Sequence, residues 1–306
     1  MALRFDGRVA VITGGGRGLG RAYAELLGGL GAKVVVNDNG SVIKGANDPG
    51  RTDAGPAQEV VDAIRAAGGK AIACTDSVAT SAGGRAIIQA AMDSWGRIDV
   101  LIHNAGNVRY GSIRELSDED LDAVLGVHLK GGFNVVRAAF PHMCDAGYGR
   151  VVLTSSIGGV YGNTNCVNYA MAKSGMIGLS NVIALEGEAH NVKSNVIVPS
   201  AVTRMADGLD ISQYPPLGPE LVAPMVGWLA HENCSVSGEL YAAVGGRMAE
   251  VFIGETKGVY QPDWTIDQVD ARIDAIRDKA EPKVFGLHGH VDHLVYSFGV
   301  ARDAQT

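Results

Sequence analysis

The sequence contains little cysteine, little proline and no long apolar run. Its 306 residues include 4 cysteines and 10 prolines. No two cysteines form a CxxC pair, which disfavours a disulfide scaffold and a cysteine metal or redox site, so we expect reduced thiols and a cytoplasmic location. No segment approaches the about 20 apolar residues of a membrane span, and the first residues lack the apolar stretch of a secretion signal.

Charge is scarce as well. Charged residues make up 19% of the chain, with 26 basic against 33 acidic residues and a net charge of −7. Affinity for phosphate backbones comes from clustered Lys and Arg, and no such cluster is present, so a nucleic-acid partner is not expected. Glycine reaches 42 residues without a three-residue period, which excludes a collagen-like chain.

The sequence does contain a regular alternation of two patterns. Short apolar runs typical of buried strands occupy residues 8–13, 33–37, 71–74, 100–103, 151–154 and 196–198. Helical spacing separates them at residues 21–30, 52–67, 82–95, 118–145 and 167–190. Apolar strands that alternate with helices predict an α/β fold with a doubly wound parallel sheet of the Rossmann type.

The alternation fades after Gly246. We therefore divide the chain into a main domain, residues 1–246, and a C-terminal extension, residues 247–306. Residues 266–280 of the extension have the spacing of an amphipathic helix, and the rest of the extension has no regular pattern. Residues 203–219 carry three prolines and suit either a lid over a pocket or a plain surface loop.

The first predicted strand runs into a glycine-rich turn. Gly14, Gly18 and Gly20 give the spacing GxxxGxG, in which backbone N–H groups can approach a pyrophosphate and the next helix directs its positive N-terminus at it. Asp38 ends the second strand, where a carboxylate binds an adenosine ribose and repels a 2′-phosphate, so NAD is favoured over NADP. Arg17 weakly favours NADP, because arginine pairs with phosphate.

Three further residues predict a site of proton transfer. Ser156 follows the fifth strand, and Tyr169 and Lys173 lie four residues apart on one face of the next helix. A free tyrosine has a pKa of about 10, too high for a base at neutral pH. A lysine ammonium about 4 Å away supplies roughly 4 kcal/mol, about the size needed to bring that pKa near neutral, with burial opposing the shift and the positive charge of an oxidised nicotinamide assisting it. A YxxxK pair alone is usually structural, so its occurrence with the glycine turn carries the prediction.

In this order and at this spacing, the motifs resemble those of the short-chain dehydrogenase/reductase family. The resemblance spans about residues 5–246 and includes the sequence Asn104-Ala105-Gly106 after the fourth strand. It implies that residues 1–246 form a dinucleotide-binding and catalytic domain. It also implies these coenzyme contacts: Gly14, Arg17, Gly18, Leu19, Gly20, Asp38, Asp76, Ser77, Asn104, Ala105, Gly106, Tyr169, Lys173, Val198 and Thr203.

Within the family, the sequence is similar to the (3R)-hydroxyacyl-CoA dehydrogenase domains of peroxisomal multifunctional enzymes of type 2. The segments that carry this similarity include Val127-His128-Leu129 and Val160-Tyr161-Gly162-Asn163. The resemblance implies a homotetramer and four catalytic residues: Ser156 to orient the alcohol, Tyr169 as base, Lys173 to lower the pKa of Tyr169, and His128.

The sequence departs from the family at several of these positions. His128 stands where most members have asparagine, whose main-chain carbonyl holds a water of the proton relay, and His103 replaces the first asparagine of the frequent NNAG. Because a main-chain carbonyl survives a side-chain change, we expect activity to persist. Ser200 replaces the usual glycine after Pro199, and Thr203 comes one residue early, which affects the contact with the nicotinamide.

Three functions are compatible with these residues. The first is NAD-dependent oxidation of a (3R)-3-hydroxyacyl-CoA, and the second is oxidation of a 17β-type hydroxysteroid or another hydrophobic alcohol at the same site. The third is an NAD-binding sensor without turnover, which the complete Ser156, Tyr169 and Lys173 set disfavours. No metal is expected, because the only histidine cluster, His288, His290 and His293, lacks a cysteine or paired carboxylate to complete it.

Overall fold

The apolar runs form one eight-stranded sheet. The structure, a computed structural model, describes residues 3–41, 55–201 and 216–303. The strands lie in the order β3-β2-β1-β4-β5-β6-β7-β8, and the pairs from β3 to β7 are all parallel. Their bounds are β1 Val9–Thr13, β2 Lys33–Asn37, β3 Lys70–Cys74, β4 Val100–His103, β5 Gly149–Thr154, β6 Val192–Ser200, β7 Leu240–Val244 and β8 Arg247–Val251.

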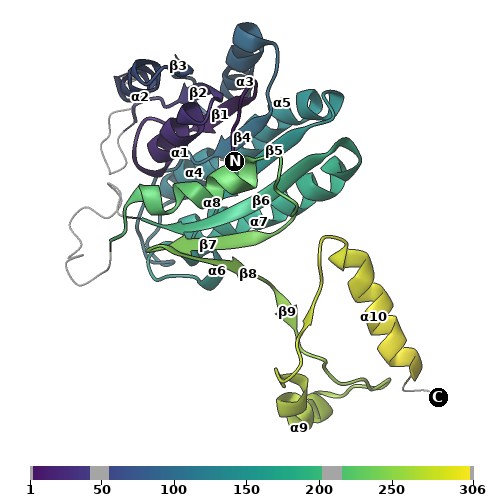
Figure 1. Cartoon of the computed structure of the whole chain (residues 1–306). Helices are drawn as coiled ribbons and strands as arrows, with labels where there is room; N and C mark the ends of the chain where they lie inside the picture. The colour runs from purple at the N-terminus through teal and green to yellow at the C-terminus, as the bar shows by residue number, and fades with distance from the viewer. Residues whose placement is uncertain (1–2, 42–54, 202–215, 304–306) are drawn as a thin grey trace. The chain divides into compact units, whose positions relative to one another are not determined.

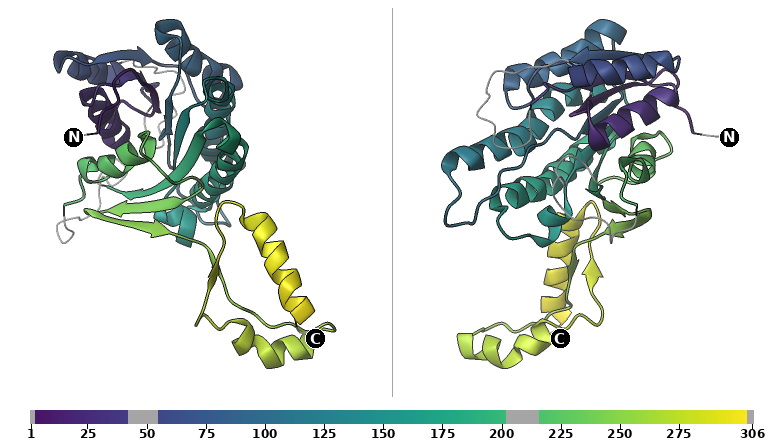
Figure 2. Two further views of the ribbon diagram at one scale, coloured as in Figure 1. Left: turned by 45° about the vertical axis from the view of Figure 1, so that its right-hand side comes forward. Right: turned by 90° about the vertical axis from the view of Figure 1, so that its left-hand side faces the viewer.

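Helices cover both faces of this sheet (Figures 1 and 2). On one face, α1 packs against α2 and α8, and on the other face α3 packs against α5 and α5 against α7. The bounds are α1 Gly18–Gly29, α2 Gly55–Ala66, α3 Ser81–Trp95, α4 Asp118–Leu125, α5 Gly131–Asp145, α6 Ile157–Tyr161, α7 Val167–Gly187 and α8 Ala223–Ala230. The predicted α/β fold with a doubly wound parallel sheet is confirmed.

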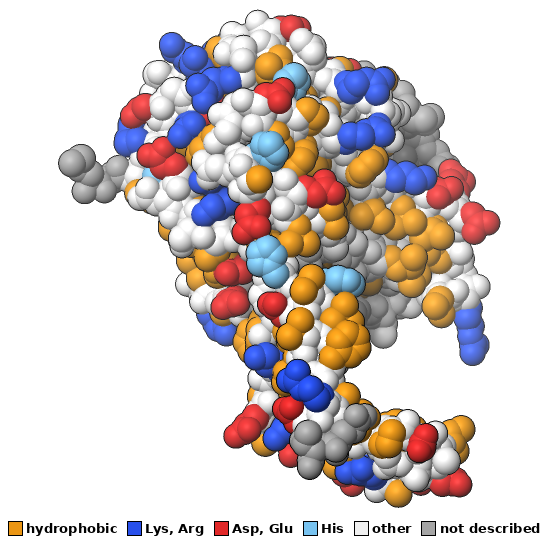
Figure 3. All heavy atoms as spheres, turned by 90° about the vertical axis from the view of Figure 1, so that its right-hand side faces the viewer, with side chains coloured by type: hydrophobic (Ala, Val, Ile, Leu, Met, Phe, Trp, Pro, Cys, Tyr) orange, Lys and Arg blue, Asp and Glu red, His pale blue; other side chains and the backbone are white. Residues whose placement is uncertain are grey.

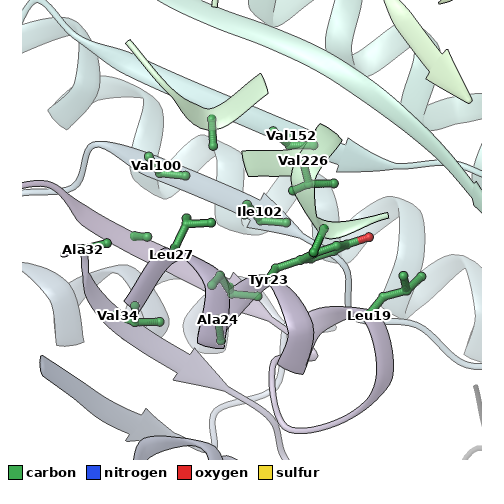
Figure 4. Close-up of a cluster of buried hydrophobic side chains, with 14 of the residues drawn as sticks. Leu19, Tyr23, Ala24, Leu27, Ala32, Val34, Val100, Ile102, Val152 and Val226 are labelled. Carbon is green, nitrogen blue, oxygen red and sulfur yellow. The ribbon is translucent and has the colours of Figure 1, made fainter. Parts of the chain in front are cut away.

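The core lies between the sheet and its helices. Figure 4 shows Tyr23 and Leu27 of α1 beside Ile102 of β4 and Val226 of α8, all completely or almost completely buried. The strands are apolar on both faces because helices cover both sides, which is why they read as continuous runs in the sequence. Burial of this core fixes the carboxyl ends of the strands, where the motif residues lie.

One predicted helix is not continuous. Residues 118–145 were expected to form a single helix, but they form α4, a π-helical turn η1 at Gly126–Lys130, and α5. The turn is bounded by Gly126 and Gly131, whose low helix propensity weakens the regular ladder at this point. It places His128 on the inside of the fold.

The contacts within the chain gather into two units, residues 1–250 and 251–306. Strand β8 follows β7 after a two-residue glycine turn and joins the sheet, so the sheet extends past the boundary expected at residue 246. The second unit contains a two-stranded sheet of β9 (Gly254–Glu255) and β10 (Lys283–Val284), with helices α9 (Ile266–Ile276) and α10 (Gly289–Asp303).

The expected helix at 266–280 is present in the second unit and ends at Ile276, earlier than expected. The expectation that the rest of the extension is irregular was wrong, because α10 is a regular helix of 15 residues. No residue of α9 or α10 is buried, and hydrophobic side chains lie at the surface of this unit among charged ones (Figure 3). In the part of the chain that the structure describes, no helix is long and apolar enough to cross a bilayer.

Candidate active site

A large cavity opens at the carboxyl ends of the parallel strands. Its volume is about 1030 Å³, and it extends from the glycine turn after β1 to the helix that carries Tyr169 and Lys173. Parallel sheets bind their ligands at this edge. The lining includes most of the predicted site: Gly14, Arg17, Gly18, Leu19, Asp38, Asp76, Ser77, Asn104, Ala105, Gly106, His128, Ser156, Tyr169 and Lys173.

The glycine turn is built to receive an anion. Helix α1 begins at Gly18, and no side chain caps its first turn, so the N–H groups at its positive end are free of side-chain acceptors. The turn is tight at Gly20, where a Cβ atom would lie 2.1 Å from the carbonyl oxygen of Gly14. Gly20 therefore shapes the turn without lining the cavity. These features fit the pyrophosphate of a dinucleotide.

Asp38 lies at the same edge, one residue after β2. Its Oδ2 accepts a hydrogen bond from the backbone N–H of Gly16, at 3.1 Å, and its Oδ1 accepts one from Gly40, at 2.9 Å. Both bonds hold the carboxylate at the wall of the cavity beside the glycine turn. A fixed negative charge here suits a ribose hydroxyl and opposes a phosphate.

Ser155 and Ser156 have different roles after β5. The Ser155 hydroxyl is buried and donates to the carbonyl of Lys173 at 2.8 Å, which ties α7 to the strand. Ser156 lines the cavity, caps α6 by accepting from Gly158 N–H at 3.1 Å, and hydrogen-bonds Tyr169. Ser155 also lines the cavity, but its hydroxyl hydrogen is committed to α7, so Ser156 is the better candidate to contact a substrate.

Tyr169 and Lys173 face each other across one turn of α7. The Nζ atom of Lys173 lies 5.6 Å from the centre of the Tyr169 ring and donates to the Thr154 carbonyl at 2.7 Å. Burial lowers the pKa of Lys173 to about 7. Burial also raises the pKa of Tyr169 above its ordinary value, although the hydrogen bond from Ser156 opposes this.

In the coenzyme-free protein, desolvation penalises the charged form of each group, which is the opposing effect of burial that was expected. A further positive charge in the cavity would favour the phenolate form of Tyr169, and an oxidised nicotinamide carries such a charge.

His128 lies against the tyrosine with its side chain buried. Its ring centre is 5.3 Å from that of Tyr169, with the rings at 87°. Its Nε2 lies 2.8 Å from the carbonyl oxygen of Asn107 and 3.1 Å from the backbone nitrogen of the same residue, and these two contacts require opposite tautomers of the ring. A Cβ atom on Gly106 would come within 2.3 Å of the His128 ring, which shows how closely the loop after β4 packs on it.

The remaining predicted contacts lie elsewhere. Val198 is buried in β6 and does not line the cavity, whereas the next residues, Pro199 to Ala201, do. Thr203 lies outside the described residues, as does most of the lid candidate 203–219. Sequence reasoning missed four residues that line the cavity because of how the loop after β4 and the starts of α4 and α7 fold over it: Asn107, Tyr110, Glu119 and Cys166.

Within residues 3–41, 55–201 and 216–303, no three His, Cys, Asp or Glu side chains are grouped as they would be around a metal ion. The histidines of the C-terminal unit make other contacts. His293 Nε2 lies 3.0 Å from the carboxylate of Glu255, and its ring stacks edge-on against Phe285.

Comparisons with known proteins identify the family of this chain. Residues 8–210 match the family model described as short chain dehydrogenase. The chain is 46% identical to the Drosophila melanogaster peroxisomal multifunctional enzyme type 2 over 258 residues, which cover 84% of this chain but only 42% of that protein. It is 35% identical to the hydroxyacyl-CoA dehydrogenase ChsB1 of Mycobacterium tuberculosis, with 80% of each chain covered.

A solved structure has the same fold. The crystal structure of a short chain dehydrogenase from Mycobacterium avium superposes with a TM-score of 0.77 at 37% identity, and the match covers 91% of this chain and 97% of that one. The motifs, the cavity at the strand ends and these matches lead to one assignment. The chain belongs to the short-chain dehydrogenase family and is an oxidoreductase.

Proposed function

We propose that this protein oxidises a (3R)-3-hydroxyacyl-CoA with NAD as the hydride acceptor. The observation that carries the proposal is the placement of Ser156, Tyr169 and Lys173 on the wall of one cavity, together with the glycine turn and Asp38. The substrate class rests on the similarity to multifunctional enzymes of type 2 and to a hydroxyacyl-CoA dehydrogenase. The (3R) configuration rests on the resemblance of the sequence segments.

The chemistry of the chain's own residues is proton transfer. A nicotinamide coenzyme, held by the glycine turn and Asp38, would supply the acceptor for the hydride of the alcohol carbon. The Ser156 hydroxyl, with one lone pair committed to the N–H of Gly158, donates its hydrogen to the alcohol oxygen. Tyr169, as a phenolate that the nearby Lys173 ammonium stabilises, accepts the hydroxyl proton and becomes a neutral phenol.

The preference for NAD rests on Asp38. Its carboxylate is held by two backbone N–H groups at the cavity wall, so it cannot easily turn away from a 2′-phosphate. Arg17 lines the same part of the cavity and is the nearest candidate to pair with phosphate. A fixed carboxylate in this position favours the coenzyme without the extra phosphate.

We propose that the protein works as a homotetramer. Several large apolar side chains are exposed on α5 and α7, among them Phe133, Met171 and Val182, each about half exposed. Exposed apolar side chains gathered on one pair of helices are typical of a subunit contact. Light scattering coupled to gel filtration would measure the mass. The cytoplasmic location stays a prediction.

The test follows NADH by its absorbance in mixtures of enzyme, coenzyme and candidate alcohols. The alcohols are (3R)- and (3S)-hydroxyacyl-CoAs and a 17β-hydroxysteroid, each with NAD and with NADP. Turnover of the (3R) thioester with NAD is expected. Turnover of the steroid alone would replace the proposed substrate, and turnover of neither, with NADH still bound, would overturn the proposed function.

A further inference from the structure

The imidazole of His103 connects three elements of the site. His103 ends β4 and is only 2% exposed. Its Nδ1 lies 3.0 Å from the hydroxyl of Thr13, the last residue of β1 before the glycine turn. Its Nε2 lies 3.0 Å from the carbonyl oxygen of His128 in the π-helical turn.

The hydrogen bonds of Thr13 determine which nitrogen of His103 carries the proton. The Thr13 hydroxyl oxygen accepts from the backbone N–H groups of Asn104 and Ala105, both at 3.1 Å. These two donors use both lone pairs, so the hydroxyl hydrogen points to Nδ1 of His103. Nε2 must then carry the imidazole hydrogen and donate it to the His128 carbonyl.

The His128 carbonyl accepts two hydrogen bonds from the protein. One comes from His103 Nε2–H and the other from the backbone N–H of Gly131, at the end of the π-helical turn. A carbonyl oxygen has two lone pairs, and both are used. The water of the proton relay that was expected on this carbonyl therefore has no remaining lone pair to bind.

The π-helical turn also positions the side chain that lies behind Tyr169. The imidazole of His128 packs edge-on against the Tyr169 ring and directly over Gly106. A change in the backbone at His128 would therefore move the ring against which Tyr169 rests. An error of about 1 Å in the position of a reacting group can cost on the order of a hundredfold in rate.

We propose that His103 is a positioning residue for Tyr169, acting through the Thr13–His103–His128 hydrogen bonds and the π-helical turn. The proposal rests on the proposed function only in so far as Tyr169 is the base. His103 and His128 both stay neutral, because burial and the positive charge of Lys173 lower the pKa of each. Among His103, His128 and Lys173, the lysine is therefore the group that carries positive charge.

The test compares His103→Phe and His103→Asn with the matched control His231→Phe. His231 is also buried and also bridges backbone groups, with Nε2 3.0 Å from the Arg4 carbonyl and Nδ1 3.0 Å from the Asn233 N–H, but it does not line the cavity. We expect His103→Phe to lower kcat about tenfold or more, with NADH affinity within about threefold of the original. His103→Asn, which keeps one donor and one acceptor, should recover part of kcat, and His231→Phe should lower stability alone.

A second measurement does not depend on any substrate. In a ¹H–¹⁵N spectrum of the histidine rings of the original protein, the His103 signal is identified as the one that is missing from His103→Phe. This signal should be that of the Nε2–H tautomer. An Nδ1–H tautomer would overturn the proposal. So would a His103→Phe variant with kcat within about twofold of the original, or one that loses kcat and NADH affinity in equal measure.

Discussion

The Lys173 ammonium lies 5.6 Å from the centre of the Tyr169 ring, and burial acts on the two groups in opposite directions. It lowers the pKa of the lysine to about 7 and raises that of the tyrosine. In the coenzyme-free site, burial therefore disfavours the charged form of each group. A further positive charge in the cavity, such as that of an oxidised nicotinamide, would favour the phenolate that proton removal requires.

We expect Tyr169→Phe to lower kcat by about a thousandfold, within the range found when a general base is removed, because phenylalanine has no group to accept the proton. NADH affinity, measured by fluorescence titration, should stay within about threefold. Tyr110→Phe is the matched control, since Tyr110 lines the same cavity and is largely exposed. An active Tyr169→Phe enzyme would show that another group is the base.

Lys173→Met should abolish turnover and also stabilise the coenzyme-free fold near about pH 6. Because the folded-state pKa of about 7 is below the unfolded value, the buried ammonium destabilises the fold fully below pH 7, and this cost disappears as the pH rises toward the unfolded pKa. The gain should be on the order of a few kcal/mol at about pH 6 and should fall towards zero above about pH 10. Urea denaturation across this range measures it. A gain that does not depend on pH would contradict the assigned shift.

Asp38→Asn should weaken the discrimination against NADP. The amide retains an acceptor for one of the two backbone N–H groups but removes the charge that opposes a 2′-phosphate. We expect the ratio of kcat/KM for NAD to that for NADP to fall by about tenfold or more. Glu119→Gln, another carboxylate on the cavity wall, should leave this ratio unchanged. An equal fall of this ratio in both variants would indicate that any negative charge in the cavity has this effect, and not a specific contact of Asp38.

Gly106→Ala should impair catalysis without unfolding the protein. The added Cβ would lie 2.3 Å from the His128 ring, so the ring must move away from its place against Tyr169. A fall in kcat of about tenfold or more is expected. Gly29→Ala is the control, because nothing lies within 4 Å of its Cβ position at the end of α1. Unchanged kcat in Gly106→Ala would mean that the position of the His128 ring does not matter.

Asp99→Asn should destabilise the fold and spare the site. Asp99 is 1% exposed at the opposite edge of the sheet, where it accepts hydrogen bonds from Arg8, Val9 N–H and Arg97. Loss of the buried charge should cost about 2–4 kcal/mol, since both arginines are partly exposed. The exposed pair of Arg4 and Asp6 provides the comparison, and Asp6→Asn should leave stability nearly unchanged because solvent screens this pair. Urea denaturation and kcat separate the two effects.

The alternation of strands and helices along most of the main domain could be predicted from the sequence, and so could the motif residues at the strand ends. Continuous apolar runs are a local signal for buried parallel strands, and a spacing of four residues is enough to place Tyr169 and Lys173 on one helix face. The helix α8 gave no such signal, because its eight residues are apolar on nearly every side. The helix α10 gave none either, because its apolar residues do not gather on one face.

The protonation of the site residues and the positions of their side chains depend on contacts that exist only in the folded chain. The direction of the pKa shifts at Tyr169 and Lys173 depends on desolvation by the whole fold, which no local spacing encodes. The carbonyl of His128, between α4 and α5, is held by a hydrogen bond from His103, a residue 25 positions away on a different element. Local patterns specify which elements form, whereas contacts between distant segments decide how their side chains are held and charged.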